Sequence, residues 1–199
     1  MSPLTHLFGS WIIATKATDN PRDCRLVALA GILPDADGLG LMLDLANSAL
    51  GRKATHFYEN YHHYLLHGAF GAAVLTLALT CFARQRWRVA MLSLIVFHLH
   101  LLCDYVGSRG PSPEDLWAIF YFGPFDKDPM WLWKGQWRLD GWQNKLVFLG
   151  VFIWSIKLTL ARGHSVVGVF NRRADAVVGV LRGWQVQLRR RSQLRAPEN

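Results

Sequence analysis

Three long apolar segments separated by polar stretches dominate the sequence. Tyr64–Ala83 holds 20 residues without Asp, Glu, Lys or Arg, Val89–Cys103 holds 15, and Leu146–Ala161 is interrupted only by Lys157. A helix of about 20 apolar residues crosses the roughly 30 Å hydrocarbon core of a bilayer. The pattern predicts an all-α, membrane-associated helical bundle with about three apolar spans, although the two shorter segments also fit buried core helices of a soluble protein.

Shorter elements are expected before these segments. A short helix is predicted near the N-terminus, and Thr18-Asp19-Asn20 before Pro21 is typical of the start of another, which extends to about Leu33. Pro34 ends that helix, because proline lacks the backbone N–H that a helix needs. Asp35-Ala36-Asp37-Gly38 then indicates a turn, after which Asp37 caps a helix that continues to about Leu50.

The stretch from Val106 to Lys145 has the composition of a loop. It holds five of the nine Trp residues and four of the eight Pro residues. Trp is favoured at the headgroup level of a membrane, so this Trp- and Pro-rich loop fits there, although an aromatic cap over a small core would have the same composition.

Charge divides the chain into two parts. The net charge is +8, and residues 162–199, with eight Arg, one Asp and one Glu, carry +6 of it. We therefore expect a helical membrane domain over residues 1–161 and a basic, amphipathic C-terminal tail over residues 162–199. Membrane lipid is the expected partner, whereas the cluster Arg189–Arg191 comes with no nucleic-acid-binding motif.

The basic residues also predict an orientation. Arg84, Arg86 and Arg88 lie between the first two apolar segments, and basic residues accumulate on the cytoplasmic side of membrane proteins. A multi-pass arrangement with three spans places both this turn and the basic tail in the cytoplasm.

Several enzyme classes are excluded by missing motifs. The sequence contains no G-x-S-x-G elbow, P-loop, G-x-G-x-x-G or H-E-x-x-H, and its three Cys residues form no C-x-x-C pair. Serine esterase chemistry, phosphate binding by a Gly-rich loop and thiolate zinc sites have no support.

His100 and Asp104 form the first candidate metal-binding pair. Four residues advance about 400° around a helix, so the two side chains lie on one face, one turn apart. They would either ligate a metal together or form a simple hydrogen bond. An ionised Asp in an apolar segment is costly unless it is paired or metal-bound.

A second group precedes the first apolar segment. His63 and His67 are also four residues apart, and a continuous helix would align them with His56 and Glu59. His62 would lie about 140° from His67 on such a helix and would reach the same centre only if the helix begins nearby. An interfacial polar cluster is the alternative interpretation.

The two groups are expected at one depth of the membrane. In an antiparallel hairpin that turns near Arg86, His67 lies 19 residues before the turn and Asp104 lies 18 residues after it. At 1.5 Å per residue, each lies roughly 27–28 Å from the turn. Asp35 and Asp37 add a D-x-D pair, which can bind cations or activate water, or simply cap a helix in a solvated turn.

These motifs together resemble the YdjM-like family of LexA-regulated, inner-membrane-associated predicted metal-dependent hydrolases of bacteria. The matching pieces are Thr5-His6-Leu7, Leu33–Gly38, His62–His67 and His100–Asp104, within residues 1–125. The sequence departs from the family's H-R-G-x-T-H-S pattern, with His63 in place of Arg, which removes a phosphate clamp. The family is distantly similar to zinc-dependent phospholipase C and P1 nuclease, which implies phosphoester cleavage.

The resemblance and the spacing together predict a membrane-bound, metal-dependent hydrolase of the bacterial inner membrane, with a divalent cation, zinc, as cofactor and a phosphoester or lipid-like substrate. The catalytic candidates are Asp37 as general base and His63 for substrate charge. A non-catalytic membrane protein with a structural or transport metal site and a soluble helical metalloenzyme are the alternatives. The expected metal ligands are His6, Asp35, His62, His67, His100 and Asp104.

Overall fold

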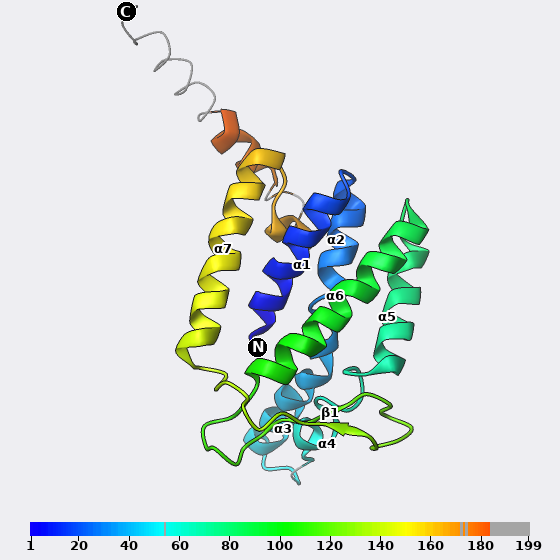
Figure 1. Ribbon diagram of the computed structural model, residues 1–199, viewed down its shortest axis with the longest axis vertical. Helices are drawn as coiled ribbons and strands as arrows, with labels where there is room; N and C mark the ends of the chain where they lie inside the picture. Colours follow the sequence, from blue (N-terminus) through cyan, green and yellow to red (C-terminus); the bar gives the residue numbers. More distant parts are fainter. Residues whose placement is uncertain (54, 172, 174, 184–199) are drawn as a thin grey trace, which may run out of the picture.

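The computed structural model describes residues 1–53, 55–171, 173 and 175–183. A bundle of helices packs side by side along one axis, and shorter elements cover one end of this bundle (Figure 1). Helix α1 packs against α2 and α7, and α6 packs against α2 and α5. The fold is therefore the predicted all-α, membrane-associated bundle. Its elements are α1 (Pro3–Ala17), α2 (Pro21–Ala30), η1 (Leu33–Leu39), α3 (Gly40–Ala49), α4 (Phe57–Tyr61), α5 (Ala69–Cys81), α6 (Arg86–Gly107), β1 (Ile119–Phe120), β2 (Met130–Trp131), α7 (Trp142–Arg162) and η2 (Val166–Val169).

The predicted start of α2 is confirmed. Asn20 is the N-cap, and its side chain accepts hydrogen bonds from the backbone N–H groups of Arg22 and Asp23, while Pro21 occupies the first turn. After Ala30 the chain bends by 49° and continues as the 3₁₀ helix η1 and then as α3. The expected Asp35–Asp37 turn lies within η1.

The helical hairpin of α5 and α6 is confirmed, but its first arm is shorter than expected. Helix α5 begins only at Ala69, and α4 ends at Tyr61, so the continuous helix that would have aligned His56 with His67 does not form. The backbone N–H of Leu66 instead donates to Asp37, and that of Ala69 donates to the Tyr121 carbonyl. These tertiary hydrogen bonds replace helical ones over residues 62–68.

Among the described residues, two helices are long and apolar enough to cross a membrane, namely α6 and α7. The bent pair of α2 with η1 and α3 satisfies the same criterion as one broken segment. The two to three candidate spans agree with the expected number, although the third is this bent pair rather than α5, which has only 13 residues.

The Trp- and Pro-rich loop crosses the lower end of the bundle in Figure 1 and contains the short antiparallel pair β1–β2. The main apolar core lies between α1, α2 and α6, around Trp11, Val27 and Val96. Part of the predicted tail packs against α2: η2 contacts this helix, and Asp175 pairs with Arg25. Residues 175–183 are helical, and Arg189–Arg191 lie outside the described residues.

Candidate metal centre

His100 and Asp104 share one face of α6, as their spacing predicts. His100 Nε2 lies 3.0 Å from Asp104 Oδ2, and both side chains are almost fully buried. This pair forms the part of the centre that local sequence spacing alone specifies.

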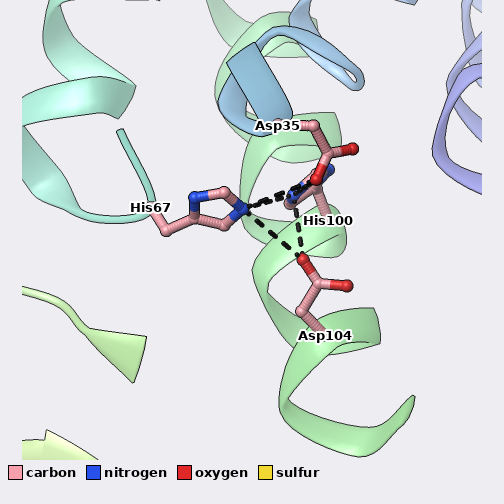
Figure 2. A group of neighbouring side chains, drawn as sticks. All are labelled: Asp35, His67, His100 and Asp104. Carbon is pink, nitrogen blue, oxygen red and sulfur yellow. Dashed lines mark hydrogen bonds and ion pairs between the residues drawn. The ribbon is translucent and has the colours of Figure 1, made fainter. Parts of the chain in front are cut away.

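Two side chains from other elements complete the group. His67 comes from the segment before α5 and Asp35 from η1, and Figure 2 shows both directed at the α6 pair. The Nε2 atoms of His67 and His100 lie 3.1 Å apart, and each lies 3.7 Å from Asp35 Oδ1. His67 Nε2 also lies 3.7 Å from Asp104 Oδ2. All four ligand atoms lie within 4.8 Å of one another, so this group can hold a metal ion.

Both imidazoles are oriented by their other nitrogen. His100 Nδ1 lies 2.8 Å from the Gly31 carbonyl oxygen, which can only accept a hydrogen bond. His67 Nδ1 lies 2.9 Å from Asp37 Oδ2. Each Nδ1–H therefore donates outward, and each Nε2 faces the centre, where it can bind a metal once it carries no proton, as in the usual arrangement of metal-ligating histidines.

Asp37 lies behind the centre rather than in the group of four. Its two oxygens accept hydrogen bonds from His67, from His62 Nδ1 at 2.8 Å and from the Leu66 backbone N–H at 3.1 Å. With His62 and His67 it forms a second group whose ligand atoms are close enough for a metal. These contacts suit Asp37 to hold His67 in place.

His6 approaches the centre from the other side. Its Nε2 lies 3.1 Å from Asp104 Oδ1, and its ring lies 3.8 Å from that of His100. The Met1 amino group and the Ser108 hydroxyl donate to the same Asp104 oxygen. The structure thus brings all six expected ligands into one region, but His6 and His62 contact carboxylates of the centre and do not belong to the group of four.

His63 is buried beside the centre, with its ring 4.4 Å from that of His67. It adopts a left-handed backbone conformation with φ of 62°, and none of the described residues forms a hydrogen bond with its buried Nδ1. Burial, followed by the neighbouring His67, lowers the pKa of His63 well below its usual value. This imidazole is therefore neutral at physiological pH.

A cavity of about 310 Å³ opens onto the centre. Its wall includes Asp35, His62 and His63 on the polar side, and Leu39, Met42 and Leu139 on the apolar side. Tyr58 also lines it, and burial, followed by the charges of Asp35 and Asp37, raises the pKa of Tyr58 to about 12. The phenol hence keeps its proton as a hydrogen-bond donor.

Trp117 forms another wall of this cavity and had no individual signal in the sequence beyond its place in the Trp-rich loop. Its ring lies 4.7 Å from that of His63, edge to face. The buried side chain of Gln136 fixes Trp117 by two hydrogen bonds, at 3.0 Å to its N–H and 2.7 Å to its carbonyl. Neither Gln136 nor the Gly31 carbonyl is recognisable as functional from sequence spacing.

The charges of the centre fit a cation. Three carboxylates, of Asp35, Asp37 and Asp104, meet there, and within the described residues their ion-pair partners are histidines and, for Asp104, also the Met1 amino group. Asp35 Oδ2 and Asp104 Oδ2 are buried without a hydrogen-bond partner, which is costly for carboxylate oxygens. Although burial lowers the pKa of His67, its bonds with Asp35 and Asp37 raise it to about 9. The protein thus supplies negative charge that a metal ion would neutralise.

A comparison with known protein families matches most of the chain, including the metal centre. A family model described as "YdjM inner membrane protein" matches residues 1–179, which include the whole centre and all candidate spans. No curated protein and no solved structure shows a significant match to the chain.

Proposed function

This chain belongs to the YdjM inner membrane protein family, and on that premise we propose that it is a membrane-bound, zinc-dependent hydrolase. The observation that carries the proposal is a buried His/Asp group that borders a cavity through one of its own members, Asp35. The proposed ligands are Asp35, His67, His100 and Asp104.

The ligand spacing supports zinc. Zn²⁺ bonds to His nitrogen and carboxylate oxygen are about 2.0–2.1 Å long, so neighbouring ligand atoms of a regular tetrahedron lie about 3.3 Å apart. Five of the six separations in this group are 3.0–3.7 Å. Mixed nitrogen and oxygen ligands at such distances favour zinc over Ca²⁺ or Mg²⁺, which prefer six or more oxygen ligands.

The surrounding residues take separate roles in the proposed reaction. When bound, a divalent cation would supply Lewis-acid chemistry, polarising a substrate oxygen and activating water. His63 lines the cavity, and we assign its neutral imidazole to accept or return a proton, while the Tyr58 phenol donates a hydrogen bond to the substrate. Asp37, expected from the sequence as general base, is assigned here to orient His67.

The membrane orientation follows from charge. Arg84, Arg86 and Arg88 surround the start of α6, at the opposite end of this helix from His100 and Asp104. Placing these arginines in the cytoplasm puts the metal centre near the outer surface of the inner membrane. The same arrangement places the C-terminal end of α7, and with it the basic tail, on the cytoplasmic side.

The substrate class that the family resemblance implies is a phosphoester. None of the described residues that line the cavity is Arg or Lys, so a phosphate there would depend on the cation, His63 and Tyr58. The expected similarity to phospholipase C and P1 nuclease stays a prediction.

A structural or transport metal site is the second candidate, because four protein ligands can fill a tetrahedral coordination sphere. The two candidate functions differ in whether the zinc-loaded protein hydrolyses an ester. We would measure zinc in the detergent-purified full chain and then hydrolysis of a panel of phosphomonoesters, phosphodiesters and carboxylic esters.

For the hydrolase we expect about one zinc per chain and turnover of at least one ester, both lost in the double variant H100A/D104A. His98→Ala is the matched control, because His98 lies on the same helix but is exposed and bonds to Tyr121. Stoichiometric zinc without turnover would support the structural or transport site. Equal metal content in wild type and double variant would refute the centre itself.

A further inference from the structure

Helix α3 leaves its apolar side chains without a covering partner in the described structure. None of its residues is buried, and it follows directly from the 3₁₀ helix that carries Asp35 and Asp37. Its polar residues form hydrogen bonds with a nearby loop: Asn47 donates to the Thr55 hydroxyl, which donates to Asp44. The large apolar side chains exposed on and beside the helix are Leu39, Leu41, Met42, Leu43, Leu45 and Leu50.

Two cavities adjoin this helix, and both reach the aspartates of η1. The cavity of about 310 Å³ ends at Asp35, and a second one of about 670 Å³ is lined by Asp37 together with Leu65 and other apolar residues. Leu39 and Met42 line both. An apolar path therefore runs from the exposed surface of α3 to the polar wall of the metal centre.

The chemistry of this surface points to lipid as its cover. A helix with so much exposed apolar surface is stable when it is buried in protein or in a membrane. The bent pair of α2 and α3 has the length and composition of a broken span, and the chain belongs to an inner membrane protein family. Broken helices at membrane depth occur where they line a site or cavity, as η1 does here.

We propose that α3 lies among the lipid chains and forms the wall along which a long-chain amphiphile enters laterally, with its polar head at the metal centre and its apolar chain against Leu39 and Met42. This inference rests on the proposed function and narrows it to substrates with an alkyl chain drawn from the bilayer. The cavity volumes lie in the range, roughly 300–1,000 Å³, that is usual for small-molecule sites.

Alkylphosphonates test the inference, because they carry an anionic head that resembles a phosphate ester but contain no ester bond to hydrolyse. Binding of butylphosphonate and octylphosphonate would be measured on the zinc-loaded full chain in detergent. Each fully buried methylene contributes about 0.8 kcal/mol, so partial burial of the four extra methylenes favours octylphosphonate at least about tenfold. We expect this ratio in the wild type.

Met42→Gln is the informative variant, because Met42 lines both cavities and is 64% exposed, so its replacement leaves the packed core intact. We expect the ratio of the two affinities to fall at least threefold, because octylphosphonate loses more affinity than butylphosphonate, with zinc content unchanged. Leu77→Gln is the matched control: Leu77 is 68% exposed but lies on α5, away from both cavities, and its ratio should equal that of the wild type.

The outcomes separate the two proposals. The lateral path would be overturned, but not the metal centre, if the wild type binds zinc and butylphosphonate without preferring the longer chain. The same conclusion would follow if the preference exists but Met42→Gln leaves it intact. If the wild type binds neither zinc nor either phosphonate, the metal centre and the lateral path are both overturned. If Met42→Gln instead dissociates a dimer in light scattering and leaves the ratio unchanged, a second copy covers α3 and the lipid path is refuted.

Discussion

His67 and His100 bring their Nε2 atoms to 3.1 Å of each other while each donates its Nδ1–H to an oxygen on the outside, Asp37 for His67 and the Gly31 carbonyl for His100. Two neutral imidazoles held in this way oppose their lone pairs, which is unfavourable unless a proton or a cation lies between them. The carboxylates of Asp35 and Asp104 flank the same point. The predictions below follow from this relationship and from the residues that maintain it.

Asp37→Ala should weaken zinc binding without removing a ligand from the group of four. The substitution frees the His67 ring to rotate, and loss of such a supporting hydrogen bond typically costs 10–100-fold in metal affinity. Competition with a chromophoric chelator measures the effect. Asp19→Ala, at an exposed carboxylate on the loop between α1 and α2, is the control, and an equal loss in both variants would contradict the positioning role.

Metal binding should release protons near neutral pH. Hydrogen bonds with Asp35 and Asp37 outweigh burial and raise the pKa of His67 to about 9, so its imidazole carries a proton in the metal-free protein at pH 7. A zinc ligand must give up that proton, hence affinity should rise with pH until about pH 9. Calorimetry in buffers of different ionisation enthalpy counts the protons. Affinity that is independent of pH between 6 and 8 would contradict the assignment of His67 as ligand.

Gly31→Ala should disturb the centre through its backbone. A Cβ at this position would lie 1.7 Å from Ser10 Oγ, so α1 and α2 would have to separate and move the carbonyl that holds His100. Overpacking of this kind costs about 1–3 kcal/mol. We expect a lower thermal midpoint together with weaker zinc binding. Gly9→Ala, where a Cβ meets nothing within 4 Å, should change neither property.

Gln136→Ala should affect turnover more than metal content. Gln136 is buried and makes both backbone hydrogen bonds of Trp117, so its loss leaves these groups unpaired at a cost of about 1–3 kcal/mol. The Trp117 ring would no longer be fixed against His63, while the four ligands stay in place. A reduced kcat with unchanged zinc stoichiometry supports this role, and loss of zinc would contradict it.

The proposed orientation can be tested with a membrane-impermeant thiol reagent on intact spheroplasts. The two test variants are Lys127→Cys, at an exposed position between β1 and β2, and Arg88→Cys, in the first turn of α6, which begins at the opposite end of the bundle from β1 in Figure 1. We expect labelling at position 127 from outside and at position 88 only after lysis. The reverse pattern would place the metal centre on the cytoplasmic side.

Several features of the protein were determined by the sequence through short-range geometry. The four-residue spacing of His100 and Asp104 places them on one face of α6, because backbone hydrogen bonding fixes the helical period. Counting residues from the arginine-rich turn placed His67 at the same depth as Asp104, and the side chains of His67 and Asp104 do meet. The apolar segments, the helix start at Asn20 and the D-x-D turn were likewise predictable from local composition.

The tertiary structure alone decided which of the clustered side chains form the group of four. On a continuous helix His63 and His67 would share one face. Instead, the backbone N–H groups of Leu66 and Ala69 donate to Asp37 and to the Tyr121 carbonyl, and the irregular path of residues 62–68 directs His67 Nε2 at His100. The Gly31 carbonyl and Gln136 act from distant elements. Such contacts depend on how separate segments pack, and packing across long sequence separations leaves no periodic signal in the chain.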